Sequence, residues 1–408
     1  MSSHPVRHHS CGCSGRVSLL GESLAFTGQL RRKILGNTVR EQRRAKACRL
    51  WSRRAAIPSP DRRYSKSMSK TLVGILLALW LSAGLAAASG NLQIYWIDAE
   101  GGAATLIVSP GGGSMLVDTA NRTADDRDAK RIFAATQKAG LQKIDILLTT
   151  HFHSDHIGGM AALVKMIPIG MYLDHGESVE IARPQVAAAY KAYVEQSEGK
   201  RRIVKAGDRI PLEGVDVQVI MSAGEGITKP LPGAGAPNAA CADFQPHGTE
   251  PDPDNDQSVG ILLQYGRFRF IDMGDLTWNY EQKLVCPNNL IGKVDLFQTT
   301  HHGLDRSNSP QFVWAIQPRV AVMNNGPHKG GPPSVFEVLR KSPGLEDIWQ
   351  GHLALGTPKE VNTDEKMIAN LEPTAQCHGN LLMVSVDSSG QYTMTNLRNG
   401  YSKTYQSR

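Results

Sequence analysis

Apolar residues in the first half of the chain occur in short runs that alternate with glycine turns and helical patterns. β-branched and other apolar side chains fill the short runs, as expected for strands joined by turns. The stretch Ala124–Ala139 has apolar positions at helical spacing and ends at Gly140. We predict strands at Leu92–Asp98, Thr105–Val108, Ser114–Asp118, Ile144–Thr149 and Ile169–Asp174, and further helices at Gly158–Met166 and Pro184–Glu195.

The second half shows the same alternation and begins near Arg202. Strands are predicted at Ile203–Val204, Asp216–Met221, Ser258–Tyr265, Phe268–Asp272, Val294–Thr299 and Val320–Met323, helices at Trp278–Leu284 and Pro310–Ile316, and a closing hairpin at Asn380–Val386 and Gln391–Asn396. The Pro- and Gly-containing segment Gly224–Asp254 predicts a long loop, and loops of this length often carry function. Strands and helices in both halves predict an α/β fold with two packed sheets and helices outside.

The apolar segment Thr71–Leu85 has the features of a secretory signal peptide. Met68 and Lys70 give a charged start, and the small residues Ala86-Ala87-Ala88 follow the run. The run is shorter than the roughly 20 residues that span a bilayer, so we expect cleavage and no stable membrane anchor afterwards. The protein would then be exported, either to the periplasm or out of the cell.

Residues 1–67 precede this signal, although a functional signal peptide normally begins the chain. They are rich in arginine and show no sustained periodicity. We therefore expect translation to start at Met68. Residues 1–67 would be a non-native or disordered extension, 68–88 the signal peptide and 89–408 one folded domain.

Charge differs sharply between these segments. The whole chain has a net charge of +7, but residues 1–88 contain 16 basic and 3 acidic residues. Residues 89–408 therefore have 29 basic and 35 acidic residues, a net charge of −6. An acidic body repels phosphate backbones, so strong non-specific nucleic-acid binding is not expected.

The body contains three cysteines, Cys241, Cys286 and Cys377. Their spacing matches no zinc motif, and their odd number leaves at least one unpaired. One disulfide can form in an oxidising compartment, and Cys241–Cys286 is a candidate pair that the sequence alone does not assign.

Three histidines and an aspartate occur within six residues, directly after a predicted strand. A turn there can direct alternate side chains into one pocket. His151 and His153 would bind one divalent ion, while Asp155 and His156 would reach a second ion or a metal-bound water. Imidazole nitrogen and carboxylate oxygen suit Zn²⁺, with Mn²⁺ or Fe as alternatives. Ordinary surface histidines are not expected at this density.

Two further motifs supply ligands that this cluster lacks. Gly274-Asp275 follows a predicted strand, where the Asp275 carboxylate could bridge two ions. His301-His302-Gly303 follows another strand end. Either motif alone is more often a turn or an ordinary histidine pair than a functional site.

With Asp118 in the sequence Leu-Val-Asp-Thr-Ala, these motifs resemble the metallo-β-lactamase superfamily. Within it, they are most similar to the hydrolase domain of ComEC-type bacterial DNA-uptake proteins and its free-standing relatives. The resemblance covers about residues 92–325 and includes Trp96–Gly102 and Asn255–Val259. It implies an αβ/βα four-layer sandwich of two mixed β-sheets flanked by helices, and two divalent metal ions.

The resemblance also implies roles for single residues. His151 and His153 would hold one metal, Asp155 and His156 the other, and Asp275 would bridge. One of His301 and His302 would be a ligand; we expect His301, with His302 facing the substrate. Asp118 would fix the histidine loop by hydrogen bonds.

The sequence departs from the family pattern at two places. Many members have a further histidine between the first cluster and the Gly-Asp turn. The nearest match here is Asp256, which we treat as a metal ligand, with His247 as a weaker substitute. The turn after the last strand contains His328 and Lys329, which could bind an anionic group or be solvated.

These features predict an exported metal-dependent hydrolase that uses metal-activated water, with Asp155 and His302 as its catalytic residues. The expected substrate is a phosphoester or phosphodiester, either a small molecule or a short oligonucleotide. The alternative within enzymes is a lactonase or β-lactamase-like ester or amide hydrolase. The alternative from another class is a non-catalytic metal-binding extracytoplasmic module, which metal analysis and activity assays would distinguish.

Overall fold

The computed structural model describes residues 90–372 and 377–408. The predictions for residues 1–67 and for the signal peptide at 68–88 lie outside this range. Within it, no helix has both the length and the apolar character needed to cross a bilayer.

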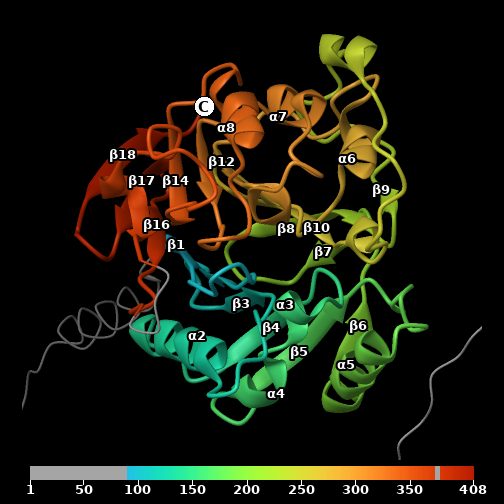
Figure 1. The fold of residues 1–408 in the computed structure, drawn as a ribbon, viewed down its shortest axis with the longest axis vertical. Coiled ribbons are helices and arrows are strands. Elements are labelled where there is room, and N and C mark those ends of the chain that lie inside the picture. The colour runs from blue at the N-terminus through green and yellow to red at the C-terminus, as the bar shows by residue number, and fades with distance from the viewer. Residues whose placement is uncertain (1–89, 373–376) are drawn as a thin grey trace, which may run out of the picture. The chain divides into compact units, whose positions relative to one another are not determined.

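Two mixed β-sheets of nine strands each form the centre of the body (Figure 1). The first has the strand order β18-β17-β16-β1-β2-β3-β4-β5-β6. Its strands are β1 (Leu92–Trp96), β2 (Thr105–Val108), β3 (Ser114–Val117), β4 (Ile144–Leu148), β5 (Ile169–Asp174), β6 (Arg201–Ile203), β16 (Leu382–Val386), β17 (Gln391–Asn396) and β18 (Ser402–Gln406).

The second sheet has the order β15-β14-β13-β12-β11-β10-β8-β7, and β9 pairs with β8. Its strands are β7 (Arg209–Ile210), β8 (Asp216–Ser222), β9 (Glu225–Gly226), β10 (Gly260–Tyr265), β11 (Phe268–Asp272), β12 (Leu296–Gln298), β13 (Val320–Met323), β14 (Asp347–His352) and β15 (Ile368–Asn370). Each sheet has an antiparallel part and a parallel part: β3 to β6 are parallel in the first, and β11 to β15 in the second.

Helices cover the outer face of each sheet (Figure 1). The α-helices are α2 (Arg127–Lys138), α3 (Ser154–Ile157), α4 (Met160–Leu163), α5 (Pro184–Gln196), α6 (Trp278–Val285), α7 (Pro310–Ile316) and α8 (Pro333–Arg340). Short 3-10 helices are η1 (Ala239–Asp243), η2 (Asn255–Gln257), η3 (Thr300–Gly303) and η4 (Glu365–Met367).

Buried apolar residues form three clusters, as a four-layer arrangement requires. The central cluster joins inward-facing residues of both sheets, such as Ile94 and Leu148 from the first and Leu296 from the second. A second cluster packs α6, α7 and α8 on one sheet, and a third packs α2, α4 and α5 on the other. The predicted fold of two mixed sheets flanked by helices is therefore confirmed.

Most predicted elements are present, but the short elements α3, β7 and β9 and the later elements α8, β14, β15 and β18 were not predicted. β14 has the sequence Asp-Ile-Trp-Gln-Gly-His, which mixes polar and apolar residues and therefore gives no strand pattern. Most of the strand is nevertheless buried, and its polar groups are paired inside the fold. The predicted hairpin exists as β16 and β17, and β18 extends it to three strands.

The predicted long loop at Gly224–Asp254 begins with β9 and contains η1, and it is otherwise irregular. A disulfide joins Cys241 in this loop to Cys286 after α6, which is the candidate pair, and Cys377 is free. The loop is thereby tied to the second sheet's helical layer at one point and, as shown below, to the functional site at another.

Candidate metal centre

The predicted site residues follow the carboxyl ends of strands in the two sheets. Asp118 comes directly after β3, and the His151 motif begins three residues after β4. In the second sheet, Asp275 follows β11, and the His301-His302 pair follows β12. Neighbouring parallel strands end at the same edge of a sheet, so residues far apart in sequence meet there.

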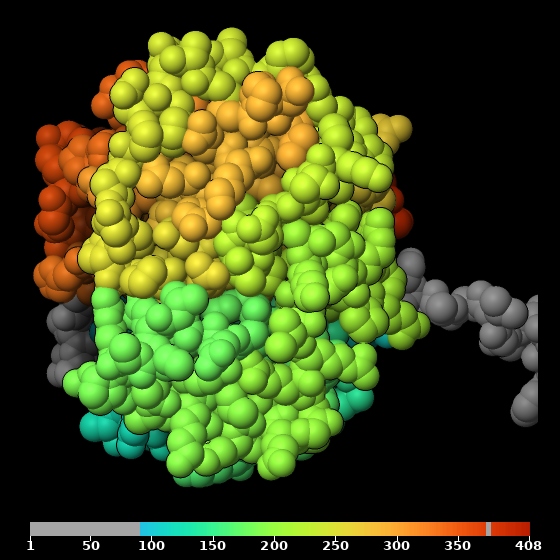
Figure 2. All heavy atoms as spheres, turned by 90° about the vertical axis from the view of Figure 1, so that its right-hand side faces the viewer, coloured from blue at the N-terminus to red at the C-terminus, as the bar shows by residue number. Residues whose placement is uncertain are grey.

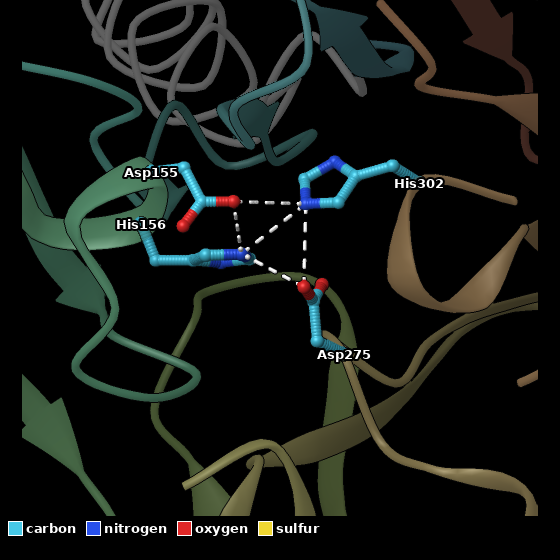
Figure 3. Close-up of side chains that lie close together, drawn as sticks. All are labelled: Asp155, His156, Asp275 and His302. Atoms are coloured by element: carbon cyan, nitrogen blue, oxygen red, sulfur yellow. Dashed lines mark hydrogen bonds and ion pairs between the residues drawn. The ribbon is translucent and has the colours of Figure 1, made fainter. Parts of the chain in front are cut away.

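Four of these side chains converge on one point: Asp155, His156, Asp275 and His302 (Figure 3). One potential ligand atom from each lies within 4.8 Å of all the others. The His156 Nε2 atom is 3.2 Å from Asp275 Oδ2 and 3.3 Å from His302 Nε2. His302 Nε2 is in turn 3.4 Å from Asp155 Oδ2 and 3.3 Å from Asp275 Oδ2.

His151 and His153 form a second, adjacent pair. The Nε2 atom of His151 lies 2.8 Å from Nδ1 of His153, and the His151 and His156 rings are 4.0 Å apart between centroids. The outer nitrogen of His153, Nε2, lies 3.3 Å from the buried carboxylate of Glu180. Glu180 therefore fixes the orientation of the His153 ring, a role that the sequence did not reveal.

Asp118 orients the histidine loop through hydrogen bonds of its buried carboxylate. Its carboxylate accepts hydrogen bonds from the Thr150 backbone N–H at 2.8 Å and from the Thr150 hydroxyl at 2.7 Å. The same carboxylate lies 2.6 Å from His156 Nδ1, which leaves Nε2 of that ring for the cluster. A buried carboxylate behind a histidine is the usual support for a metal-binding imidazole.

Close backbone approach explains the glycines after the histidine motif. A Cβ atom on Gly158 would lie 2.3 Å from the Arg122 nitrogen, and one on Gly159 would lie 2.1 Å from the Thr119 oxygen. Gly158 itself has ordinary helical angles (φ −62°). Any side chain here would push the histidine loop away from the segment that follows β3.

The two histidines after β12 take different places, and the expectation that His301 is the ligand stays a prediction. His302 is fully buried and belongs to the four-residue cluster. His301 lines the adjacent pocket, although its Nε2 also lies 3.3 Å from Asp275 Oδ2. Both residues have left-handed backbone angles, with φ of 57° and 56°, and this tight turn directs the second ring inward. His302 is thus part of the four-residue cluster, whereas His301 faces the pocket beside it.

Asp256 is not brought into the cluster. Its carboxylate accepts a hydrogen bond from the Thr277 hydroxyl, and burial raises its pKa. His247 stacks on Trp278, with 4.2 Å between ring centroids. Neither residue supplies the additional ligand beside His151 and His153 in this arrangement.

The turn after β13 contributes one residue to the site. Lys329 forms an ion pair with Asp155 Oδ2 and lines the pocket, whereas His328 is exposed to solvent. Gly330 allows this turn to pack against the histidine pair, because a Cβ there would lie 1.9 Å from the His302 carbonyl oxygen.

The acids and bases of the cluster shift one another's pKa values. Burial would raise the pKa of Asp155 and Asp275, but the neighbouring imidazoles, joined by Lys329 beside Asp155, together outweigh it and hold both pKa values well below the usual range. Burial lowers the pKa of His151 well below its ordinary value, and it lowers that of His301 to about 4. Burial opposes protonation of His156, but the carboxylates of Asp275, Asp118 and Asp155 outweigh it and raise the pKa of this ring well above its ordinary value. A metal bound at His156 Nε2 would therefore displace a proton.

These residues fit a divalent metal site. The cluster places two imidazole nitrogens and two carboxylate oxygens face to face in a buried space, which is a donor set suited to zinc and similar ions. His151 and His153 likewise direct two nitrogens toward each other. Asp155, His156, Asp275 and His302 would hold one ion, and His151 and His153 would contribute to a second.

Comparison with known proteins identifies the family. Residues 97–236 match the model of the metallo-beta-lactamase superfamily. Recombination protein 2 of Haemophilus influenzae is 26% identical over 253 residues, which are 61% of this chain and 26% of that protein. Residues 97–236 of this chain are therefore a region of the metallo-beta-lactamase superfamily. The chain is distantly homologous to Recombination protein 2, to ComE operon protein 3 of Bacillus subtilis and to competence protein ComA of Neisseria gonorrhoeae.

Two further similarities are more limited. A UPF0173 metal-dependent hydrolase of Cupriavidus necator is 34% identical over 84 residues, covering 21% of this chain and 27% of that protein. The solved metallo-beta-lactamase fold protein YhfI of Bacillus subtilis has 11% identity and a TM-score of 0.39, covering 63% of this chain and 96% of that one. The chain thus spans about a quarter of the length of the curated relatives named here.

A pocket of about 310 Å³ opens beside the candidate metal-binding residues. Asp155, Asp275, His153 and His301 line it, together with five further charged side chains. Those side chains are Glu180, Arg183, Asp252, Arg306 and Lys329, of which only Lys329 was considered from the sequence. They lie in loops between elements, where local sequence gives no periodic signal.

Proposed function

We propose that the body of this chain is a metal-dependent hydrolase that cleaves phosphoesters or phosphodiesters. The observation that carries the proposal is the meeting of Asp155, His156, Asp275 and His302 beside a pocket lined by three basic side chains. The name of the Cupriavidus relative, a metal-dependent hydrolase, supports the same reaction class.

The chain's own groups have distinct tasks in this reaction. Divalent ions, when bound, would lower the pKa of a water molecule and offset charge on the leaving oxygen. Asp155 lies at the pocket wall, with a carboxylate that can orient a water and accept its proton. Lys329 holds that carboxylate in place and adds positive charge where the ester oxygen becomes negative.

Pocket charge supports an anionic substrate. The lining contains four acidic side chains (Asp155, Glu180, Asp252 and Asp275) and three basic ones (Arg183, Arg306 and Lys329). Two divalent cations would change this net charge from −1 to +3. A phosphate ester then gains attraction that a neutral lactone or amide does not.

Export remains part of the proposal. The disulfide between Cys241 and Cys286 supports it, because structural disulfides persist mainly in the periplasm and outside the cell. The proposed signal peptide would deliver the domain there.

The test is hydrolysis of bis-p-nitrophenyl phosphate, a lactone and a cephalosporin by the chain loaded with Zn²⁺ or Mn²⁺. We expect cleavage of the phosphodiester, and a loss of at least about a hundredfold in His153→Ala and Asp155→Ala. Asp216→Asn, on the exposed end of β8, is the control. Cleavage of only the lactone or the cephalosporin would contradict the phosphoester proposal.

A further inference from the structure

Two arginines from opposite halves of the body meet on one aspartate at the pocket. Arg183 precedes α5, Arg306 lies between η3 and α7, and Asp252 belongs to the long loop before η2. Arg183 Nη1 is 3.0 Å from Asp252 Oδ1, and Arg306 Nη1 is 3.5 Å from Asp252 Oδ2. Each carboxylate oxygen thus faces a different guanidinium, an arrangement that two oxygens of a phosphate group can also adopt. On the face shown in Figure 2, green segments of the first half meet yellow segments of the second.

Asp252 is held in this place by the residues that follow it. Two positions later, the buried carboxylate of Asp254 accepts hydrogen bonds from the backbone N–H groups of Phe152 at 2.8 Å and Val179 at 3.0 Å. The Asp252 carbonyl oxygen accepts a hydrogen bond from the Asn255 N–H at 3.0 Å. The long loop is therefore anchored directly to the histidine motif, and it delivers Asp252 to the arginines.

Each arginine has a second acidic partner that does not depend on Asp252. Arg183 Nη1 is 2.9 Å from Glu180 Oε2, and Arg306 Nη1 is 2.7 Å from Glu250 Oε1. Both guanidiniums would keep these contacts if Asp252 were displaced by another anion. A pair of pre-positioned arginines loses little conformational entropy on binding, which favours a binding role.

Solvent reaches all three side chains. Their exposed fractions are 46% for Arg183, 39% for Asp252 and 37% for Arg306. Arg306 also borders a second hollow of about 300 Å³, which is lined by His247 and Trp278. An anionic group at the arginines would therefore lie between the pocket of the metal centre and a neighbouring space that can hold the rest of a ligand.

We propose that Arg183 and Arg306 form a subsite for a second phosphate group, distinct from the one that is cleaved. In the ligand-free protein, Asp252 occupies the place of that group's oxygens. The proposal rests on the proposed function only in assigning this phosphate to the substrate. The contact between the arginines and a phosphate does not require hydrolysis.

Binding is measured first, on the full-length chain dialysed free of metal, with inorganic pyrophosphate as the probe in isothermal titration calorimetry. Asp252→Asn removes the competing charge, and we expect affinity to rise at least about threefold. Arg306→Gln or Arg183→Gln in that background should reverse the gain. Matched controls are Asp216→Asn and Arg209→Gln, which change an exposed ion pair elsewhere. The Arg-rich residues 1–88 are present in every variant, so their contribution cancels.

A different result is expected if the ion pairs of Asp252 with Arg183 and Arg306 only stabilise the fold. Asp252→Asn would then lower the melting temperature while the pyrophosphate affinity stayed the same, and this outcome overturns the proposal. In the Asp252→Asn background, Arg306→Lys keeps the charge but loses the planar fork. Phosphate recognition is supported if this Arg306→Lys protein binds pyrophosphate more weakly than the Asp252→Asn chain does, but more tightly than the protein with Arg306→Gln does. Equal binding by these three proteins overturns it.

Substrate specificity is measured second, with the metal-loaded chain. Thymidine 3′-phosphate 5′-(p-nitrophenyl phosphate) has a second phosphate, whereas thymidine 5′-(p-nitrophenyl phosphate) lacks it. We expect the first to have the lower KM, and we expect the KM ratio to approach one in Arg306→Gln. A ratio unaffected by the substitution contradicts the subsite. Absence of hydrolysis with both compounds contradicts the proposed function, while the pyrophosphate result still decides the subsite.

Discussion

At the scale of single residues, the tight turn at His301 and His302 determines which imidazole enters the four-residue cluster. Both have positive φ, which costs of order 1 kcal/mol or more for each non-glycine residue. Such strain is commonly retained at functional sites because the surrounding structure imposes it. Here the turn sends His302 into the buried cluster and leaves His301 on the pocket wall.

This geometry predicts different effects for two matched substitutions. His302→Gln should lower bound metal by about one equivalent per chain, because it removes a donor atom from the four-residue cluster. His301→Gln should retain the metal and mainly alter KM for the ester. Metal content by mass spectrometry after gel filtration, followed by steady-state kinetics, measures both. Loss of metal in His301→Gln with full retention in His302→Gln would restore the assignment expected from the sequence.

At the scale of elements, α6 supports the histidine turn through one buried acid. Glu281 accepts hydrogen bonds from the backbone N–H groups of Asn308 and Ser309, each at 2.8 Å. Asn308 in turn accepts from the Thr300 N–H at 3.0 Å and donates to the Thr300 carbonyl at 2.9 Å. The turn that carries His301 and His302 is thus connected to a helix on the outer layer.

Glu281 predicts a pH dependence of stability. Burial raises its pKa from 4.5 to about 7, even though the N–H groups of Ser309 and Asn308 oppose the shift. The folded state therefore binds more protons than the unfolded state between these values. Its contribution to the free energy of unfolding is largest below pH 4.5 and declines as pH rises toward 7, by at most about 1.4 kcal/mol per pH unit.

Urea unfolding of Glu281→Gln between about pH 5 and pH 8 measures this contribution as a difference from the unsubstituted chain. We expect a flatter pH profile in the variant, and a profile unchanged in the exposed control Glu198→Gln. Parallel profiles for Glu281→Gln and the unsubstituted chain would show that Glu281 does not titrate in this range.

At the scale of the whole body, the disulfide fixes the long loop that carries Asp252. Cys241 and Cys286 are 45 residues apart, so their bond restricts the unfolded chain over that length. Chain-entropy arguments give a stabilisation of about 4 kcal/mol for a loop of this size, and disulfides typically contribute about 2–4 kcal/mol. The bond lies outside the metal centre, so its main effect is on stability and on the order of the loop.

Replacing both cysteines tests this contribution. Cys241→Ser with Cys286→Ser should lower the free energy of unfolding by about 2–4 kcal/mol, as measured in urea without reductant. Cys377→Ser is the matched control, because Cys377 is free. Equal stability of the double variant and the control would mean that the disulfide does not stabilise the folded body.

Elements in which apolar residues recur at regular spacing could be predicted from the sequence, because that spacing alone shows which face is buried. β4 and β11 are short segments in which most residues are apolar, and α2 places Ile132 inward at helical spacing. β14 and β15 could not be predicted in this way. Their polar residues, such as His352 and Asn370, are buried with partners from distant segments: His352 with Asp98, and Asn370 with Gly351 and Asn380.

The resemblance to the metallo-β-lactamase superfamily and the set of candidate metal-binding residues could be predicted from the sequence, because the histidines and carboxylates are concentrated in short motifs after predicted strands. The three-dimensional contacts were needed to show that His302 enters the cluster and that Asp256 stays outside it. They were also needed to find the charged side chains around the pocket, which are Glu180, Arg183, Asp252 and Arg306. The type of donor atom is encoded locally, but the direction of a side chain depends on backbone turns and on partners that are more than a hundred residues away. The position of a loop residue such as Asp252 is fixed by the anchoring of Asp254 to the histidine motif, and no local pattern records that contact.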